Sequence, residues 1–133
     1  LRALGAKTAL ITGVVLKDGD SECKSPAESA SAPLGTRIGN PSAKHVNAWM
    51  GADGQMHMLS YEPVDAAFPG TGDLFASVIA GALTREKPLD CAVAIATEYT
   101  RLAMLNTVNC ATVPVYGVQL EQTLGTLISM ISD

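Results

Sequence analysis

The first half of the chain carries the hydrophobic patterns of strands. A β-branched apolar run predicts a short buried strand over residues 7–16, punctuated by Thr12-Gly13. Residues 46–52 and 55–64 predict two more strands, and in the second of them apolar and polar positions alternate. Asp53-Gly54 joins these two strands. A two-residue Asp-Gly connection favours a type I′ hairpin turn, because glycine adopts positive φ at little cost.

The second half follows helical spacing. Apolar residues recur at intervals of three and four, which predicts helices over residues 73–84, 89–106 and 118–131. In the first helix, Leu74, Phe75, Val78, Ile79 and Leu83 have the spacing of a buried helix. The residues that share one face are Ala92, Ile95, Ala96, Tyr99, Leu102 and Ala103 in the second helix and Leu120, Leu124, Leu127, Ile128 and Ile131 in the third. Gly5 is expected to end a helix that precedes the first strand. The order of elements predicts an α/β fold truncated at its N-terminal side.

Residues 17–41 interrupt this pattern. They are rich in Ser, Ala, Gly and Pro and have little periodicity, which predicts a flexible loop. A loop this long inside one domain is typical of a variable surface excursion or a mobile flap. We therefore expect residues 1–133 to form part of a single domain that carries one flexible insertion.

Composition and charge exclude several classes of function. The net charge of −4 and the pI of about 5.0 argue against nucleic acid and anionic membranes as partners. The longest apolar stretch, residues 74–83, is roughly half of what a membrane span needs. The aromatic content is 5% against 47% hydrophobic residues, so the core is expected to consist of small aliphatic side chains.

The cysteines and histidines predict neither disulfides nor a metal site. Cys23, Cys91 and Cys110 are odd in number and widely spaced, which favours a reducing, cytoplasmic setting. Cys91 lies in an apolar run and is interpreted as a core residue. His45 and His57 are interpreted as surface or core residues, because three scattered cysteines and two histidines do not form a ligand cluster.

The segment with the clearest chemistry is Gly70-Thr71-Gly72-Asp73. Two glycines let the backbone turn sharply and approach a ligand, and the unpaired amides of the helix that follows favour a phosphate. Thr71 adds a hydroxyl. A carboxylate beside a phosphate is unfavourable unless it has a role, and in phosphoryl transfer Asp73 would accept the proton of the attacking hydroxyl.

A structural role is the alternative for this tetrapeptide. Taken by itself, it fits a tight turn in which Asp73 caps a helix as well as it fits a phosphate site. The context favours the phosphate site, because strands precede the turn and a helix with buried-helix spacing follows it. Small residues in that helix, including Ala76 and Ala80, permit close packing of backbones.

With these residues in view, the chain resembles the ribokinase-like kinases. The segment from Val64 to Ala76, which contains Gly-Thr-Gly-Asp-Leu-Phe-Ala, is most similar to the signature of pyridoxal kinases. Ile11-Thr12 resembles the end of the strand that contacts the nucleotide in that family. The resemblance implies the C-terminal part of a three-layer α/β/α fold. It also implies ATP and Mg²⁺ as cofactors, with a monovalent cation as a further candidate.

The resemblance also implies roles for individual residues. Asp73 would deprotonate the 5′-hydroxymethyl group of pyridoxal, pyridoxine or pyridoxamine, and Gly70, Thr71 and Gly72 would form the anion hole. Nucleotide contacts would come from Thr12, Val64, Phe68 and Met104. For Val64, Phe68 and Met104, an ordinary place in the core remains an equal alternative. Gly13 stands where these kinases often have Ser, which removes one hydroxyl.

Two further expectations concern the complete protein. The chain begins at Leu1 without an initiator Met, and in this family the preceding region supplies most of the acceptor pocket. We therefore expect the 133-residue chain alone to be inactive, and the full-length form to be a homodimer. The alternatives that remain open are the same chemistry on a hydroxymethylpyrimidine, sugar or nucleoside, and a truncated module without activity.

Overall fold

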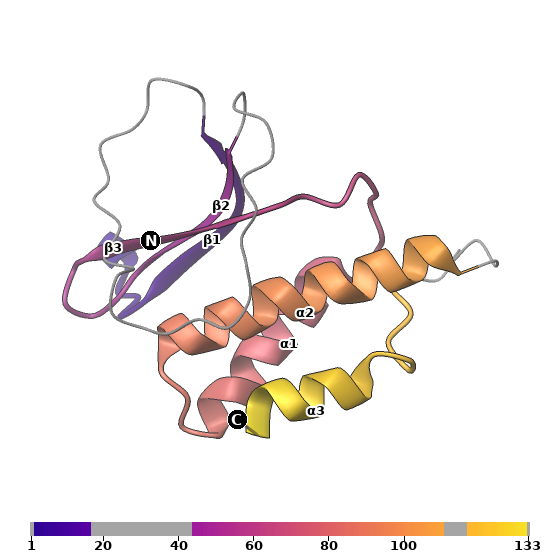
Figure 1. Cartoon of the computed structure of the whole chain (residues 1–133). Helices are drawn as coiled ribbons and strands as arrows, with labels where there is room; N and C mark the ends of the chain where they lie inside the picture. The colour runs from indigo at the N-terminus through magenta and orange to yellow at the C-terminus, as the bar shows by residue number, and fades with distance from the viewer. Residues whose placement is uncertain (1, 17–43, 111–116, 133) are drawn as a thin grey trace. The chain divides into compact units, whose positions relative to one another are not determined.

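The computed structural model describes residues 2–16, 44–110 and 117–132 (Figure 1). The chain divides into two compact units, Leu1–Glu62 and Pro63–Asp133. The described strands belong to the first unit and the described α-helices to the second. The loop predicted over residues 17–41 lies outside the described residues.

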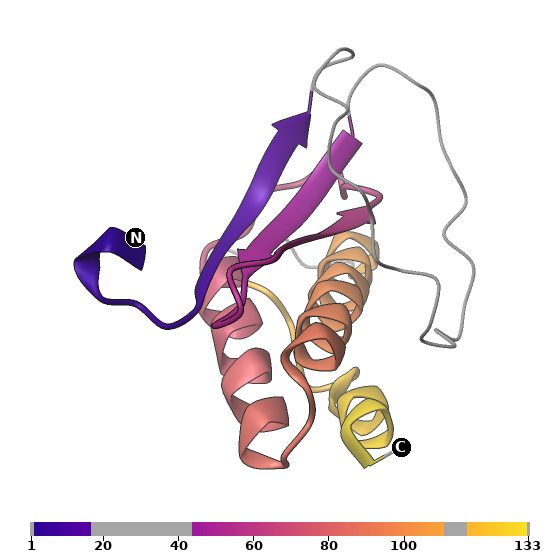
Figure 2. The ribbon, with the colours of Figure 1, turned by 90° about the vertical axis from the view of Figure 1, so that its left-hand side faces the viewer.

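The first unit is a three-stranded antiparallel sheet. Its strands β1 (Ala9–Leu16), β2 (Lys44–Met50) and β3 (Met56–Tyr61) lie side by side in chain order (Figure 2). All the predicted strands are confirmed, with ends that differ by up to three residues. Val46 and Trp49 of β2 are buried, and the Trp49 ring stacks on the His57 ring of β3 at 5.4 Å between centroids. Before β1, the short 3₁₀ helix Arg2–Leu4 ends at Gly5, whose φ of 95° agrees with its predicted role.

The hairpin between β2 and β3 is confirmed, but its predicted type I′ turn is wrong. The turn hydrogen bond runs from Gly54 N to Gly51 O at 3.1 Å, so Ala52 and Asp53 are its central residues. A type I′ turn needs positive φ at both central residues, and only Gly54, one position later, has it. The Asp53 carboxylate accepts a hydrogen bond from Gln55 N at 3.1 Å, which holds the longer loop closed.

The second unit consists of the helices α1 (Thr71–Thr84), α2 (Leu89–Asn109) and α3 (Leu124–Ser132). α1 lies along α2, and α3 contacts α2 (Figure 1). The predicted core residues Phe75, Val78 and Tyr99 are buried. Leu83, predicted to be buried, is 44% exposed, and Ala82 beside it is fully buried instead. Alanine at this position permits close packing, whereas Ala76 and Ala80, which were expected to do the same, are exposed.

The third predicted helix begins later than expected. The amide of Gln119 donates to Thr107 Oγ1 of α2 at 2.9 Å, and residues 117–120 are not helical. α3 therefore starts at Leu124, after a turn in which Thr123 N donates to Leu120 O. Two of the apolar residues that the spacing brings together on this helix are exposed in the described structure: Leu124 is 45% and Ile128 is 67% exposed.

Candidate functional site

The start of α1 leaves backbone amides free to bind an anion. Gly70 caps the helix in the left-handed conformation (φ 83°, ψ −2°), and none of the side chains that the structure describes caps it. The first helical hydrogen bond runs from Leu74 N to Gly70 O at 2.9 Å. The amides of Thr71, Gly72 and Asp73 precede it and so have no acceptor within the helix. Together with the helix dipole, they can bind a negatively charged group.

The side chain of Thr71 makes a hydrogen bond within the turn. Its hydroxyl donates to Phe68 O at 2.6 Å, which fixes the backbone just before the two glycines. Sequence reasoning expected this hydroxyl to be a donor to the phosphate. In the structure it is engaged within the turn, and the amide of Thr71 is the group that the turn presents.

Gly72 is a glycine that the fold does not require. It lies inside α1, its φ is not positive, and a Cβ there would meet no described atom within 4 Å. Glycine inside a helix costs about 0.5–1 kcal/mol relative to alanine. The open space beside Gly72 lies next to the amides that have no helical acceptor. A phosphate bound to these amides would need this space to be free of a side chain.

Asp73 lies in the first turn of α1, and its side chain is exposed. Within the part of the chain that the structure describes, its carboxylate has neither a hydrogen-bond nor an ion-pair partner. A carboxylate at a helix N-terminus is favourable toward the dipole. It is also accessible to a hydroxyl group brought in by a substrate.

Sequence reasoning missed the close packing of Gly117 against Pro69, the residue before the glycine turn. Gly117 is buried with φ 115°, and a Cβ on it would stand 2.8 Å from Pro69 O, just before Gly70. Two residues later, Gln119 is bonded to Thr107 of α2. The segment 117–119 is therefore held between α2 and the glycine turn. A single glycine after a hydrophobic run carries no sequence signal for such a contact.

Thr12, the predicted nucleotide contact of the first unit, lies in an irregular part of β1. The register of β1 with β2 shifts between Ile11 and Val14, and both Thr12 and Gly13 are exposed. The Gly13 amide donates to Asn47 Oδ1 at 3.2 Å. The hydroxyl of Tyr61 lies 4.0 Å from where a Cβ on Gly13 would stand. Partial burial raises the pKa of this phenol, so it stays neutral at physiological pH.

The remaining predicted nucleotide contacts stay undecided between the two alternatives. Val64, Phe68 and Met104 are all half-buried, so each is partly accessible and partly packed. Among these three residues, Phe68 is linked to the glycine turn, because its carbonyl oxygen accepts the hydrogen bond from the Thr71 hydroxyl. Met104 lies on α2, and its position on that helix was expected from the sequence.

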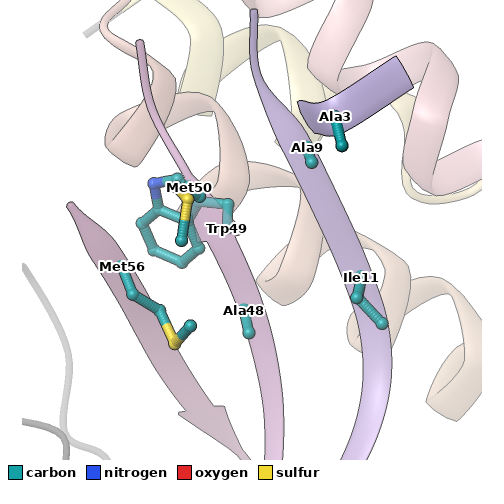
Figure 3. Close-up of a pocket in the computed structure, with 7 residues that line it drawn as sticks. All are labelled: Ala3, Ala9, Ile11, Ala48, Trp49, Met50 and Met56. Carbon is teal, nitrogen blue, oxygen red and sulfur yellow. The ribbon is translucent and has the colours of Figure 1, made fainter. Parts of the chain in front are cut away.

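A separate hollow of about 390 Å³ lies in the first unit (Figure 3). Figure 3 shows Trp49, Met50 and Met56 on one side of it and Ile11 and Ala9 on the other. None of its lining side chains is charged. The hollow is therefore suited to apolar groups and offers no charged side chain to a phosphate.

The described residues form neither a metal-binding cluster nor a membrane-spanning helix. Within residues 2–16, 44–110 and 117–132, no group of three or more His, Cys, Asp or Glu could hold a metal ion. His45 instead lies beside the Tyr61 ring, and Cys91, predicted to be core, is only half-buried. None of the described helices has the length and apolar character needed to cross a membrane.

The comparisons with known proteins identify the family of the chain. A family model described as phosphomethylpyrimidine kinase matches residues 1–115. Because the match covers most of the chain, the chain belongs to this family of kinases. No curated protein sequence matches it significantly.

Two solved structures are similar to the chain. One is a pyridoxal kinase from Lactobacillus plantarum, with a TM-score of 0.58 and 28% identity, over 65% of this chain and 32% of that one. The other is described as a putative phosphomethylpyrimidine kinase from Bacteroides thetaiotaomicron, with a TM-score of 0.59 and 28% identity, over 64% of this chain and 30% of that one. The predicted ribokinase-like α/β fold and the resemblance to pyridoxal kinases are thus confirmed. The chain spans about a third of the length of either structure.

Proposed function

We propose that the chain supplies the phosphate-binding turn and the general base of an ATP-dependent kinase. Its acceptor is the 5′-hydroxymethyl group of pyridoxal, pyridoxine or pyridoxamine. The observation that carries the proposal is the uncapped start of α1. There, the amides of Thr71 and Gly72, which have no acceptor within the helix, lie within one helical turn of the Asp73 carboxylate, which has no partner among the described residues.

The residues of the turn act at different points of the reaction. The amides bind the phosphate oxygens and stabilise the charge that builds up during transfer. Asp73 accepts the hydroxyl proton as the acceptor oxygen attacks the γ-phosphorus of ATP. The bond from this phosphorus to the β–γ bridging oxygen then breaks, and ADP leaves. Gly72 allows the close approach that these contacts need.

Kinases of this kind use ATP with Mg²⁺, which neutralises phosphate charge when bound. The amides at the start of α1 fit the phosphates of ATP. The described residues contain no cluster that fits the metal. We therefore assign no residue of the described chain to Mg²⁺ and derive no step through it.

A hydroxymethylpyrimidine is the second candidate acceptor. The matching family model and one of the two similar structures carry the name of a phosphomethylpyrimidine kinase. The proposed chemistry at Asp73 is the same for both acceptors, because each presents a primary hydroxyl on an aromatic heterocycle. The turn itself therefore does not discriminate between them.

A coupled assay of ADP release decides between the acceptors. The native protein, in its full-length form, is incubated with Mg²⁺-ATP and, separately, with pyridoxal, pyridoxine, pyridoxamine and hydroxymethylpyrimidine, and each phosphorylated product is identified by mass. We expect the highest kcat/KM with a B6 vitamer. A preference for the pyrimidine would mean that the kinase proposal stands and that the acceptor is a hydroxymethylpyrimidine. Binding of ATP without turnover of any acceptor would favour a module without activity.

Gly72→Ala is expected to separate stability from nucleotide binding. The free energy of unfolding should rise by about 0.5–1 kcal/mol, because alanine is the better helix former and meets no described neighbour. The affinity for a non-hydrolysable ATP analogue should fall about tenfold, because the added Cβ occupies space beside the phosphate. Thermal unfolding and titration calorimetry measure the two effects.

Gly81→Ala is the matched control for this prediction. Gly81 lies in the same helix, and a Cβ there also meets no described atom within 4 Å. Its substitution should give the same stabilisation and leave nucleotide affinity unchanged. Equal nucleotide affinities for the two variants would contradict a phosphate site at Gly72.

A further inference from the structure

The irregularity in β1 is a β-bulge opposite a single residue of β2. Ile11 pairs with Ala48 and Val14 pairs with Val46, so Thr12 and Gly13 both lie opposite Asn47. Ile11 and Ala48 lie on adjacent strands in Figure 3. Two residues against one is the defining count of a bulge, and Gly13 allows it by adopting φ 69°. Sequence reasoning noted Thr12-Gly13 as a break in the strand but did not find its partner.

Asn47 is a buried polar residue committed to this bulge. Asn47 is only 3% exposed, and its neighbours in the strand are the buried Val46 and the half-buried Ala48. Its Oδ1 accepts the hydrogen bond from Gly13 N at 3.2 Å. A bulge takes its extra residue out of the regular ladder, and the carboxamide of Asn47 supplies the acceptor that the Gly13 amide would otherwise lack. The polar Asn47 between the apolar Val46 and Ala48 was the feature of the sequence that could have indicated this contact.

The bulge changes what β1 presents to solvent. In a regular strand, successive side chains point to opposite faces. Around the bulge, Ile11, Thr12 and Gly13 are exposed in succession. Without the extra residue, every position after it would move to the other face of the sheet. The conformation that exposes the Thr12 hydroxyl therefore depends on the bulge keeping its shape.

We propose that Asn47 is a positioning residue for nucleotide binding. It holds the Thr12–Gly13 bulge in the conformation from which Thr12 contacts ATP. This inference rests on the proposed kinase function and on the nucleotide contact of Thr12 that the family resemblance implies, and it adds a residue to them. Asn47 acts through Thr12 and does not itself touch the nucleotide.

The test uses the native protein and two substitutions of Asn47. Asn47→Leu keeps the volume and removes the acceptor, whereas Asn47→Asp keeps a side-chain oxygen at the same place. For Asn47→Leu, we expect KM for ATP to rise about tenfold, the ratio that corresponds to one lost hydrogen bond. Its kcat and its KM for the acceptor should stay within about twofold of native. Asn47→Asp should restore most of the affinity for ATP.

A double-mutant cycle tests whether Asn47 acts through Thr12. Thr12→Val should raise KM for ATP to a similar extent, and the double variant should be no worse than either single variant. If the increases in KM for ATP of the two single variants multiplied in the double variant, the inference would be overturned, because Asn47 and Thr12 would then contribute independently. An Asn47→Leu variant that folds and has native KM for ATP would also overturn it.

Amide exchange and nucleotide binding distinguish failure of this inference from failure of the proposed function. Hydrogen exchange at the Gly13 amide should accelerate in Asn47→Leu and not in Asn47→Asp. If the native protein binds a non-hydrolysable ATP analogue and Asn47→Leu binds it equally well, the positioning role is wrong and the kinase proposal stands. If the native protein binds no nucleotide, both fail.

Discussion

Asp73→Asn is expected to reduce kcat by about 10²–10⁴-fold, the range for loss of a general base. Asparagine has nearly the same shape but cannot accept the proton of the attacking hydroxyl. Asp73 is exposed and has no partner among the described residues, so the substitution breaks no described contact. ATP affinity should stay the same or increase, because a negative charge beside the phosphates is removed. Steady-state kinetics and calorimetry with a non-hydrolysable ATP analogue measure both quantities.

The control for this prediction is Asp90→Asn. Asp90 is the acidic residue in the first turn of α2, as Asp73 is in α1. Both substitutions remove a carboxylate from a helix N-terminus, which is worth about 0.3–1 kcal/mol of stability. Only Asp73→Asn should affect turnover. A fall in kcat of less than about tenfold, with ATP binding unchanged, would exclude Asp73 as the base.

Gly117→Ala is expected to lower the free energy of unfolding by about 2–4 kcal/mol. Two costs add. Alanine is strained at the φ of 115° found here, and its Cβ would stand 2.8 Å from the backbone oxygen of Pro69. Neither side can yield easily, because Gln119 ties the segment to Thr107 and the Pro69 oxygen belongs to backbone. Urea unfolding of the native protein and the variant measures the loss.

The same substitution should also weaken nucleotide binding in the folded protein. Pro69 directly precedes Gly70, so a shift that relieves the contact moves the start of α1 and its amides. Gly125→Ala is the matched control in the same C-terminal segment. Gly125 lies within α3 and a Cβ there meets no described atom within 4 Å, so this change should stabilise by about 0.5–1 kcal/mol. A Gly117→Ala variant as stable as native protein would contradict the proposed packing.

Several features of the fold were predictable because they depend on local sequence. All described strands were expected, and so were the three α-helices. The glycine turn before α1 was also expected, since glycine readily adopts the positive φ found at Gly70. The errors concern contacts between distant residues. The burial of Ala82 in place of Leu83 and the late start of α3 both depend on packing against α2, which no local pattern records.

The sequence by itself determined the chemistry at the start of α1. Four consecutive residues, Gly70 to Asp73, contain the turn, the amides and the carboxylate, so their proximity follows from covalent connection and helix geometry. Only the tertiary structure decided what supports these residues. Gly117 reaches Pro69 across more than forty positions of the sequence, and Asn47 accepts from Gly13 across 34. Such pairs are set by the packing of whole elements, because the free energy that joins them comes from burial and register rather than from local conformational preference.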